Sequence, residues 1–160
     1  MSEPPFPPAK YRLKFENKMC KMCQTCAAVC SLNKWGETST SLGAFHLDID
    51  FYTADVNIDF CKQCVSPSCA IVCPKDAIQY NEQRGVMETD VEKCNGCTHC
   101  VTACPVGAIS YNRHLKKASK CNMCGLCVEF CPGDAISIVE VTKYGREKTP
   151  AVKEKTEATP

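Results

Sequence analysis

Residues 94–105 read Cys-Asn-Gly-Cys-Thr-His-Cys-Val-Thr-Ala-Cys-Pro, and the fold that we expect follows from this stretch. Three cysteines stand at steps of three, and a fourth stands four residues later, directly before a proline. Thiols at such short intervals in a tight loop can direct several sulfur atoms at one compact object. The proline fixes φ and removes a backbone donor where the chain leaves the loop. The stretch therefore predicts a site for a compact metal–sulfur group.

The same pattern occurs four times, and the four groups together use all 16 cysteines of the chain. Group 2 has two extra residues before its third thiol, and group 1 is followed by Ser31 in place of a proline. Four repeats exclude chance clustering of cysteines. The members are Cys20, Cys23, Cys26 and Cys30 in group 1; Cys61, Cys64, Cys69 and Cys73 in group 2; Cys94, Cys97, Cys100 and Cys104 in group 3; and Cys121, Cys124, Cys127 and Cys131 in group 4.

The residues around the last cysteine of groups 2, 3 and 4 form an internal repeat as well. Each Cys-Pro pair is followed, after two residues, by Ala-Ile, at 77–78, 108–109 and 135–136. We expect each repeat to run as a cysteine loop, a short helix such as 70–72 or 128–130, and a strand that begins at the isoleucine. Residues 77–89 are predicted to form a hairpin with its turn at 81–85.

Two other chemistries compete for the cysteines. Structural zinc sites are usually built from two Cys-x-x-Cys pairs a dozen or more residues apart, whereas these groups are tight quartets. Disulfide frameworks are typical of small secreted domains, and the N-terminal Met-Ser-Glu-Pro-Pro opens no apolar signal segment. Both interpretations are therefore much weaker than iron and sulfide.

The quartet followed by proline is the pattern of bacterial ferredoxins, in which the fourth cysteine ligates the neighbouring cluster. We therefore predict four 4Fe–4S clusters. The expected fold is α+β, with two nested bacterial-ferredoxin-like units made of short helices and small antiparallel sheets. The predicted divisions are an extended, proline-rich N-terminal arm (1–10), a four-cluster domain (11–142) and a charged C-terminal tail (143–160). A chain this short buries a modest core, so we expect the iron-free protein to be largely unfolded.

Outside the repeats, two regions carry strand signals. Residues 11–15 alternate as Tyr-Arg-Leu-Lys-Phe and predict a strand that leads to group 1. The long connection 31–60 is expected to contain strands near 44–49 and 56–58 together with irregular loop. No Gly-rich phosphate loop is present, and the three histidines have no ligand spacing, so we expect no active site in this chain.

The formal net charge of +1 hides a larger negative charge in the loaded protein. Each oxidised cluster with four thiolates would add about −2, so four would bring the chain to about −7. This argues against a nucleic-acid partner. No apolar run is long enough to span a membrane, and we expect a cytoplasmic location without direct membrane insertion. Five lysines near the groups either offset the cluster charge or are solvated surface: Lys18, Lys21, Lys62, Lys93 and Lys120.

Spacing leaves the pairing of the groups open. Groups 2 and 3 are separated by 73–94, groups 3 and 4 by 104–121, and groups 1 and 2 by the longer 30–61. Pairing 2 with 3 leaves 1 and 4 to pair around them. The rival pairs 1 with 2 and 3 with 4, and the long first gap only slightly disfavours it.

The chain resembles a known family over residues 11–141. The stretch 61–74, Cys-Lys-Gln-Cys-Val-Ser-Pro-Ser-Cys-Ala-Ile-Val-Cys-Pro, is similar to the second group of the four-cluster subunits that serve molybdenum and tungsten oxidoreductases of the dimethyl-sulfoxide-reductase type. The missing proline after group 1 also fits. The resemblance implies nested pairing and these ligand sets: Cys20, Cys23, Cys26 and Cys131 for cluster 1; Cys30, Cys121, Cys124 and Cys127 for cluster 2; Cys61, Cys64, Cys69 and Cys104 for cluster 3; and Cys73, Cys94, Cys97 and Cys100 for cluster 4.

The resemblance also implies a function, a non-catalytic electron-transfer subunit of an oxidoreductase complex. The chain lacks the long insertions of many members and looks most like the small electron-transfer subunits of tungsten aldehyde oxidoreductases. Single electrons would then pass between a tungsten- or molybdenum-pterin catalytic subunit and a flavin (FAD/NADH) subunit or ferredoxin. The alternatives are a free-standing polyferredoxin, or a subunit of a carbon monoxide dehydrogenase, hydrogenase or formate dehydrogenase complex. Clusters at both ends would also permit head-to-tail self-association.

Overall fold

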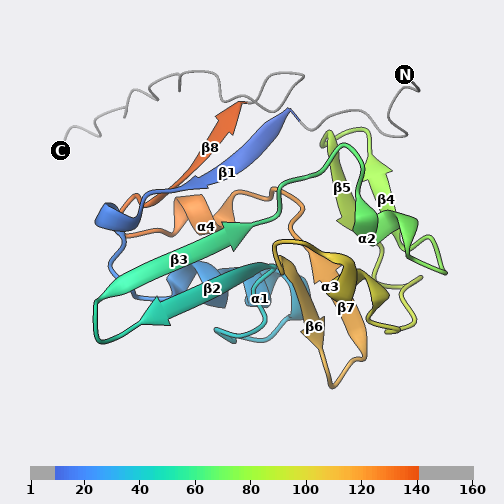
Figure 1. The fold of residues 1–160 in the computed structure, drawn as a ribbon, viewed down its shortest axis with the longest axis horizontal. Helices are drawn as coiled ribbons and strands as arrows, with labels where there is room; N and C mark the ends of the chain where they lie inside the picture. Colours follow the sequence, from blue (N-terminus) through green and yellow to red (C-terminus); the bar gives the residue numbers. More distant parts are fainter. Residues whose placement is uncertain (1–9, 141–160) are drawn as a thin grey trace.

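The computed structural model describes residues 10–140. All but Lys10 of the predicted N-terminal arm, and the whole predicted tail, lie outside the described residues. Within them, short helices alternate with two-stranded antiparallel sheets (Figure 1). This confirms the predicted α+β class with small antiparallel sheets. None of the described helices is long and apolar enough to cross a membrane.

Four two-stranded sheets are formed in the described part of the chain. Three are local hairpins, and the fourth joins the two ends of the described chain. The pairs are β1 (Tyr11–Phe15) with β8 (Ile136–Glu140), β2 (Phe45–Asp50) with β3 (Asp55–Phe60), β4 (Ile78–Asn81) with β5 (Val86–Thr89), and β6 (Ile109–Asn112) with β7 (Lys117–Lys120). The strands predicted at 11–15 and in the hairpin 77–89 are confirmed.

The sheet of β1 and β8 pairs the first strand of the described residues with the last one (Figure 1). Its register pairs Tyr11 with Glu140 and Phe15 with Ile136. Ile136 is the isoleucine of the third Ala-Ile repeat, so the strand of this repeat pairs with β1. The strands of the other two repeats, β4 and β6, each pair with the next strand along the sequence. The segments that carry groups 1 and 4 are thereby held together.

The helices pack in two pairs, one from the segments of groups 1 and 4 and the other from the segments of groups 2 and 3. Helix α1 (Thr25–Trp35) packs against α4 (Leu126–Glu129), and α2 (Ser68–Ile71) packs against α3 (His99–Ala103). A 3₁₀ turn, η1 (Asn17–Met19), precedes Cys20. Each α-helix contains or precedes the last cysteine of its group, as the repeat predicted, although α2 and α4 start two residues earlier than expected.

The connection 31–60 was predicted as strands and irregular loop, and its first part is different. Helix α1 continues through Cys30 to Trp35 and ends where Gly36 adopts φ +73°. Groups 2, 3 and 4 have a proline at the position of Ser31, and a proline there removes a helix donor and clashes with the preceding turn. Ser31 instead allows the helix to continue, and its hydroxyl donates to the carbonyl of Ala28 at 3.0 Å. Strands β2 and β3 then form one hairpin.

The buried apolar residues form two clusters, and cysteines belong to both. The larger contains Ala27, Val56, Ile58 and the ring pair Phe45–Phe60, whose centroids lie 5.1 Å apart. The smaller contains Ile78, Met87 and Ile109. Five cysteines are themselves buried in these clusters: Cys30, Cys61, Cys100, Cys121 and Cys127. These five thiols are therefore part of the buried core itself, together with the apolar side chains.

Candidate metal centres

Cysteines from two different groups line one cavity between α2 and β6. Cys61, Cys64 and Cys69 come from group 2, and the fourth thiol, Cys104, comes from group 3. Group 3 can supply the fourth thiol because Cys104 lies past the end of α3, on the side that faces group 2. Pro67, Val106 and Ile109 complete the apolar part of the lining. We refer to this set of thiols as site 3.

A second cavity shows the reciprocal crossing. Its thiols are Cys94, Cys97 and Cys100 from group 3 and Cys73 from group 2. Ala77, Ile78 and Ala118 cover it from the strands of two hairpins. We refer to this set as site 4. Groups 2 and 3 thus exchange their last cysteines.

For groups 1 and 4, the same exchange is indicated by the thiols that act on the pKa of the half-buried Cys26 and of the buried Cys127. Burial, with repulsion from Cys23, Cys131 and Cys20, raises the pKa of Cys26 to about 11. Burial also raises the pKa of Cys127, with repulsion from neighbouring thiolates that include Cys121, Cys30 and Cys124. We refer to Cys20, Cys23, Cys26 and Cys131 as site 1, and to Cys30, Cys121, Cys124 and Cys127 as site 2.

The four sites follow one another as a row, because one thiol of each lies near a thiol of the next. Cys26 of site 1 contributes to the raised pKa of Cys127 in site 2. Burial raises the pKa of Cys121 in site 2 to about 12, and Cys61 of site 3 contributes to this rise. Burial raises the pKa of Cys100 in site 4 to about 11, and Cys69 of site 3 contributes to this rise. The order along the row is 1, 2, 3, 4.

Backbone N–H groups donate to six of the sulfur atoms, at distances of 3.3 to 3.4 Å. Two of the donors are alanines of the Ala-Ile repeat: Ala77 donates to Cys73, and Ala135 donates to Cys131. Such bonds favour the charged sulfur and help to set the potential of a bound cluster. The small alanine thus has a role that its sequence position alone does not reveal. The remaining pairs are Met22 to Cys20, Ala44 to Cys30, Ala118 to Cys94, and Met123 to Cys121.

The donor set fits iron–sulfur clusters. Buried thiols with raised pKa values ionise only when a positive centre is supplied, and metal binding does this. Among residues 10–140, no group of three or more His, Cys, Asp or Glu side chains is arranged to hold a single metal ion. The thiols of sites 3 and 4 line shared cavities, and backbone N–H groups donate to sulfur in sites 1, 2 and 4. Thiols around a shared space with N–H donors nearby are the environment of 4Fe–4S clusters.

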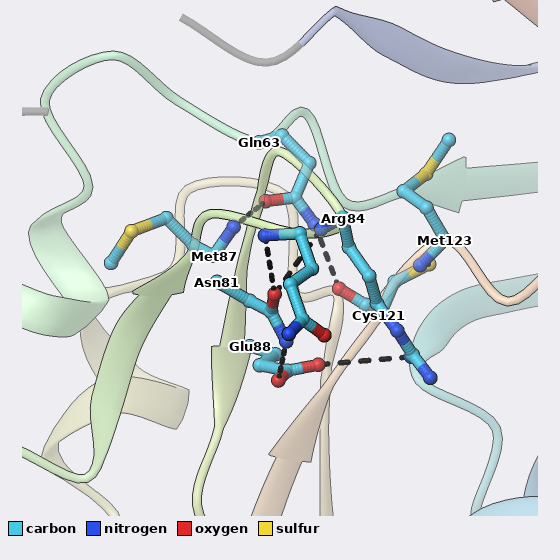
Figure 2. A network of polar contacts seen from close by, with 8 residues as sticks. Gln63, Asn81, Arg84, Met87, Glu88, Cys121 and Met123 are labelled. Atoms are coloured by element: carbon cyan, nitrogen blue, oxygen red, sulfur yellow. Dashed lines mark hydrogen bonds and ion pairs between the residues drawn. The ribbon is translucent and has the colours of Figure 1, made fainter. Parts of the chain in front are cut away.

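Gln63 links sites 2 and 3 and was not singled out by the sequence. Its side chain, 2% exposed, stands between Cys61 and Cys64. Its Nε2 donates to the carbonyl of Cys121 at 2.7 Å, and its Oε1 accepts from the backbone N–H of Met87 at 2.9 Å (Figure 2). One amide therefore connects the group 2 loop, the group 4 loop and β5. A glutamine within a cysteine loop carries no sequence signal for this contact.

Replacing Gln63 by leucine should destabilise the iron-loaded protein by about 2–4 kcal/mol, because it leaves two buried backbone groups without partners. Ser110→Ala is the matched control. It removes a single buried side-chain bond, from Ser110 Oγ to the Ser119 carbonyl, within one hairpin. Its cost should be about 1 kcal/mol. Anaerobic denaturant unfolding of both variants measures the difference, and equal losses would contradict the role of Gln63 between the two loops.

A glycine holds the site 4 loop against the β6–β7 turn. Gly96 adopts φ +74°, and a Cβ at this position would lie 2.1 Å from the carbonyl oxygen of Lys116. The Lys117 ammonium donates to the carbonyl of Cys94 at 2.5 Å in the same region. Only glycine permits this approach of the two backbones.

Comparison with known proteins gives matches to ferredoxin-type subunits. The family described as 4Fe-4S dicluster domain matches residues 53–141, which include groups 2, 3 and 4. The chain is 31% identical over 114 residues to an uncharacterized ferredoxin-like protein, YdhY, of Escherichia coli (62% of this chain, 55% of the relative). It is 30% identical over 122 residues to a subunit of tetrathionate reductase from Salmonella typhimurium (70% and 47%). It is 28% identical over 118 residues to one component of the anaerobic dimethyl sulfoxide reductase from Escherichia coli (64% and 56%). The chain spans about half the length of these relatives.

Proposed function

Because this protein belongs to the family of 4Fe-4S dicluster domains, we propose that it is an electron-transfer subunit that holds four 4Fe–4S clusters in a row. The proposal is supported by the two cavities in which groups 2 and 3 exchange their last cysteines. The thiols that act on the pKa of Cys26 and of Cys127 support the same exchange between groups 1 and 4. Sites 1 and 2 would form one unit and sites 3 and 4 the other, within a domain of residues 11–142. The pairing of β1 with β8 and of α1 with α4 supports this division.

The thiols of each set would ligate one cluster, with the assignment given for sites 1 to 4. When bound, a 4Fe–4S cluster accepts and releases one electron at a time. The chain itself fixes the separation of neighbouring sites, directs N–H groups at sulfur and covers the sites with apolar side chains. Ile78 and Ala118 at site 4 and Val106 and Ile109 at site 3 provide such cover. All four thiols of a set would be used for ligation, so no step of substrate chemistry is assigned to this chain.

The proposed partner is a molybdenum- or tungsten-pterin catalytic subunit. Relatives named as subunits of tetrathionate and dimethyl sulfoxide reductases support this class. Within it we propose a tungsten aldehyde oxidoreductase complex, in which the chain delivers electrons to a flavin subunit or ferredoxin. A cytoplasmic location and head-to-tail self-association stay predictions, and light scattering of the purified complex tests the second.

The test is anaerobic co-expression of this chain with the catalytic subunit of a tungsten aldehyde oxidoreductase. We expect co-elution at a fixed stoichiometry, and loss of the brown iron–sulfur absorbance when an aldehyde is added. The control is the chain expressed alone, which an aldehyde should leave unchanged. If reduced protein is instead reoxidised by tetrathionate or dimethyl sulfoxide, a reductase complex is the partner. A chain that elutes alone, fully loaded and without a fixed partner, would be a free-standing polyferredoxin.

A further inference from the structure

Lys120 lies at the end of β7 and contributes its side chain to the lining of site 3. It is 1% exposed and is among the largest fully buried side chains of the described residues. Lysine is almost never fully buried unless it is paired, because removing its charge from water is unfavourable. The ion pairs given for residues 10–140 join Arg84 with Glu88 and Lys93 with Asp90, and Lys120 takes part in neither. The fold therefore buries a basic side chain apart from these ion pairs.

The groups that face Lys120 are the thiols of site 3. Cys61, Cys64, Cys69 and Cys104 line the same cavity. Burial raises the pKa of Cys69, and the positive charge of Lys120 is the main influence that opposes this rise. A cluster with four thiolates carries a net negative charge of about −2 in the oxidised state. The anion that faces Lys120 would then be the bound group itself.

The other lysines near the groups have different surroundings. Lys18, Lys21, Lys62 and Lys93 are exposed, so solvent and salt screen their charges. No lysine or arginine lines the cavity of site 4 in the described structure, and the half-buried Lys117 ammonium beside it donates to the carbonyl of Cys94. Near site 2, Lys34 is half-buried. Its charge lowers the pKa of Cys30 and of Cys121, but burial raises the pKa of both thiols more strongly. Lys120 is the buried cation among them.

Given the proposed electron transfer, we propose that the positive charge of the buried Lys120 raises the reduction potential of the cluster at site 3 relative to that of the cluster at site 4. One electron enters the site from a neighbouring site and one leaves to the next. No bond is formed or broken in the protein, and the step would move a single electron. The added electron makes the site more negative, so a buried positive charge stabilises the reduced form.

The reduction potential would then differ from site to site along the row. Site 3 is the first site of its unit beside site 2, through Cys61 and Cys121. A raised potential at site 3 lets an electron rest at the junction of the two units. Lys120 belongs to the group 4 segment but acts on a site built from groups 2 and 3. The two units are therefore coupled by charge as well as by the Gln63 bridge.

The test is a redox titration of the purified, iron-loaded chain, with each cluster followed by electron paramagnetic resonance. Lys120→Met removes the charge and keeps the length of the side chain. We expect the potential of one cluster to become more negative while the other three stay unchanged. Lys62→Met is the matched control, because Lys62 lines the same site but is exposed, and it should shift no potential. Lys120→Arg retains the charge and should give a titration close to that of the wild type.

Several results would overturn the inference. Equal shifts in Lys120→Met and Lys62→Met would do so, as would a shift shared by all clusters. If Lys120→Met binds less iron, the inference requires full iron content in Lys120→Arg, and iron loss in both variants would overturn it. A wild-type chain without redox-active clusters would remove the proposed function itself, which the untreated protein reveals before any variant is titrated.

Discussion

Protein from which the iron has been removed should lose its cooperative unfolding transition. Its sheets have only two strands each, and an isolated two-stranded sheet is marginally stable at best. Three of the described α-helices have four or five residues, too few to persist without packing. The buried clusters contain five cysteines, which lose their common ligand when iron is removed. Binding free energy at the four sites is therefore a large part of the folding free energy.

Circular dichroism and thermal scans before and after anaerobic chelation measure this effect. We expect the loaded protein to melt cooperatively and the chelated protein to show no transition. Reconstitution with iron and sulfide should restore the transition, which separates unfolding from chemical damage. A cooperative transition in protein shown to be free of metal would mean that the apolar clusters suffice on their own.

Two double variants with equal numbers of lost thiols should retain different amounts of iron. The loaded wild type should contain about sixteen irons, four for each cluster. Cys104→Ser with Cys64→Ser removes two ligands from site 3 alone, so about twelve irons should remain. Cys104→Ser with Cys97→Ser removes one ligand each from sites 3 and 4, so about eight should remain. The difference is a non-additive effect of the kind that double-mutant cycles detect.

The comparison distinguishes the crossed arrangement from its simplest rival. If each group held its own cluster, Cys104 and Cys97 would belong to one site and the order of the two iron contents would reverse. Iron and protein are measured on the same anaerobic samples. The single variants provide the control, since each should lose about four irons. Identical iron contents in the two double variants would contradict both arrangements.

Local patterns in the sequence predicted the local elements well. The alternation of residues 11–15 predicted β1, and turn residues between two apolar stretches predicted the β4–β5 hairpin. The mostly apolar residues just before the fourth cysteine of a group predicted the short helices. The partner of β1 could not be predicted in this way, because β8 lies at the other end of the described chain and pairing over such a separation leaves no local signal.

The helix at the start of the first connection has a local cause in the sequence. Ser31 stands where the other groups have proline, and this difference allows the helix to continue beyond Cys30. Lys120 and Gln63 are different cases. The sequence leaves Lys120 open between offsetting the cluster charge and solvated surface, and it does not single out Gln63. Only tertiary packing buries both side chains. The sequence pattern predicts which residue types bind iron and sulfide, whereas the residues that connect or tune the sites depend on contacts between distant segments.

The β1–β8 pairing has a consequence for biosynthesis. A ribosome releases β1 first and β8 last, so the first strand waits with its backbone groups unpaired until almost the whole domain has emerged. The thiols of sites 3 and 4 are all available once residue 104 has been made, while sites 1 and 2 need residues from both ends. Under the proposed ligand sets, sites 3 and 4 can therefore mature on the nascent chain before sites 1 and 2, which wait for Cys131.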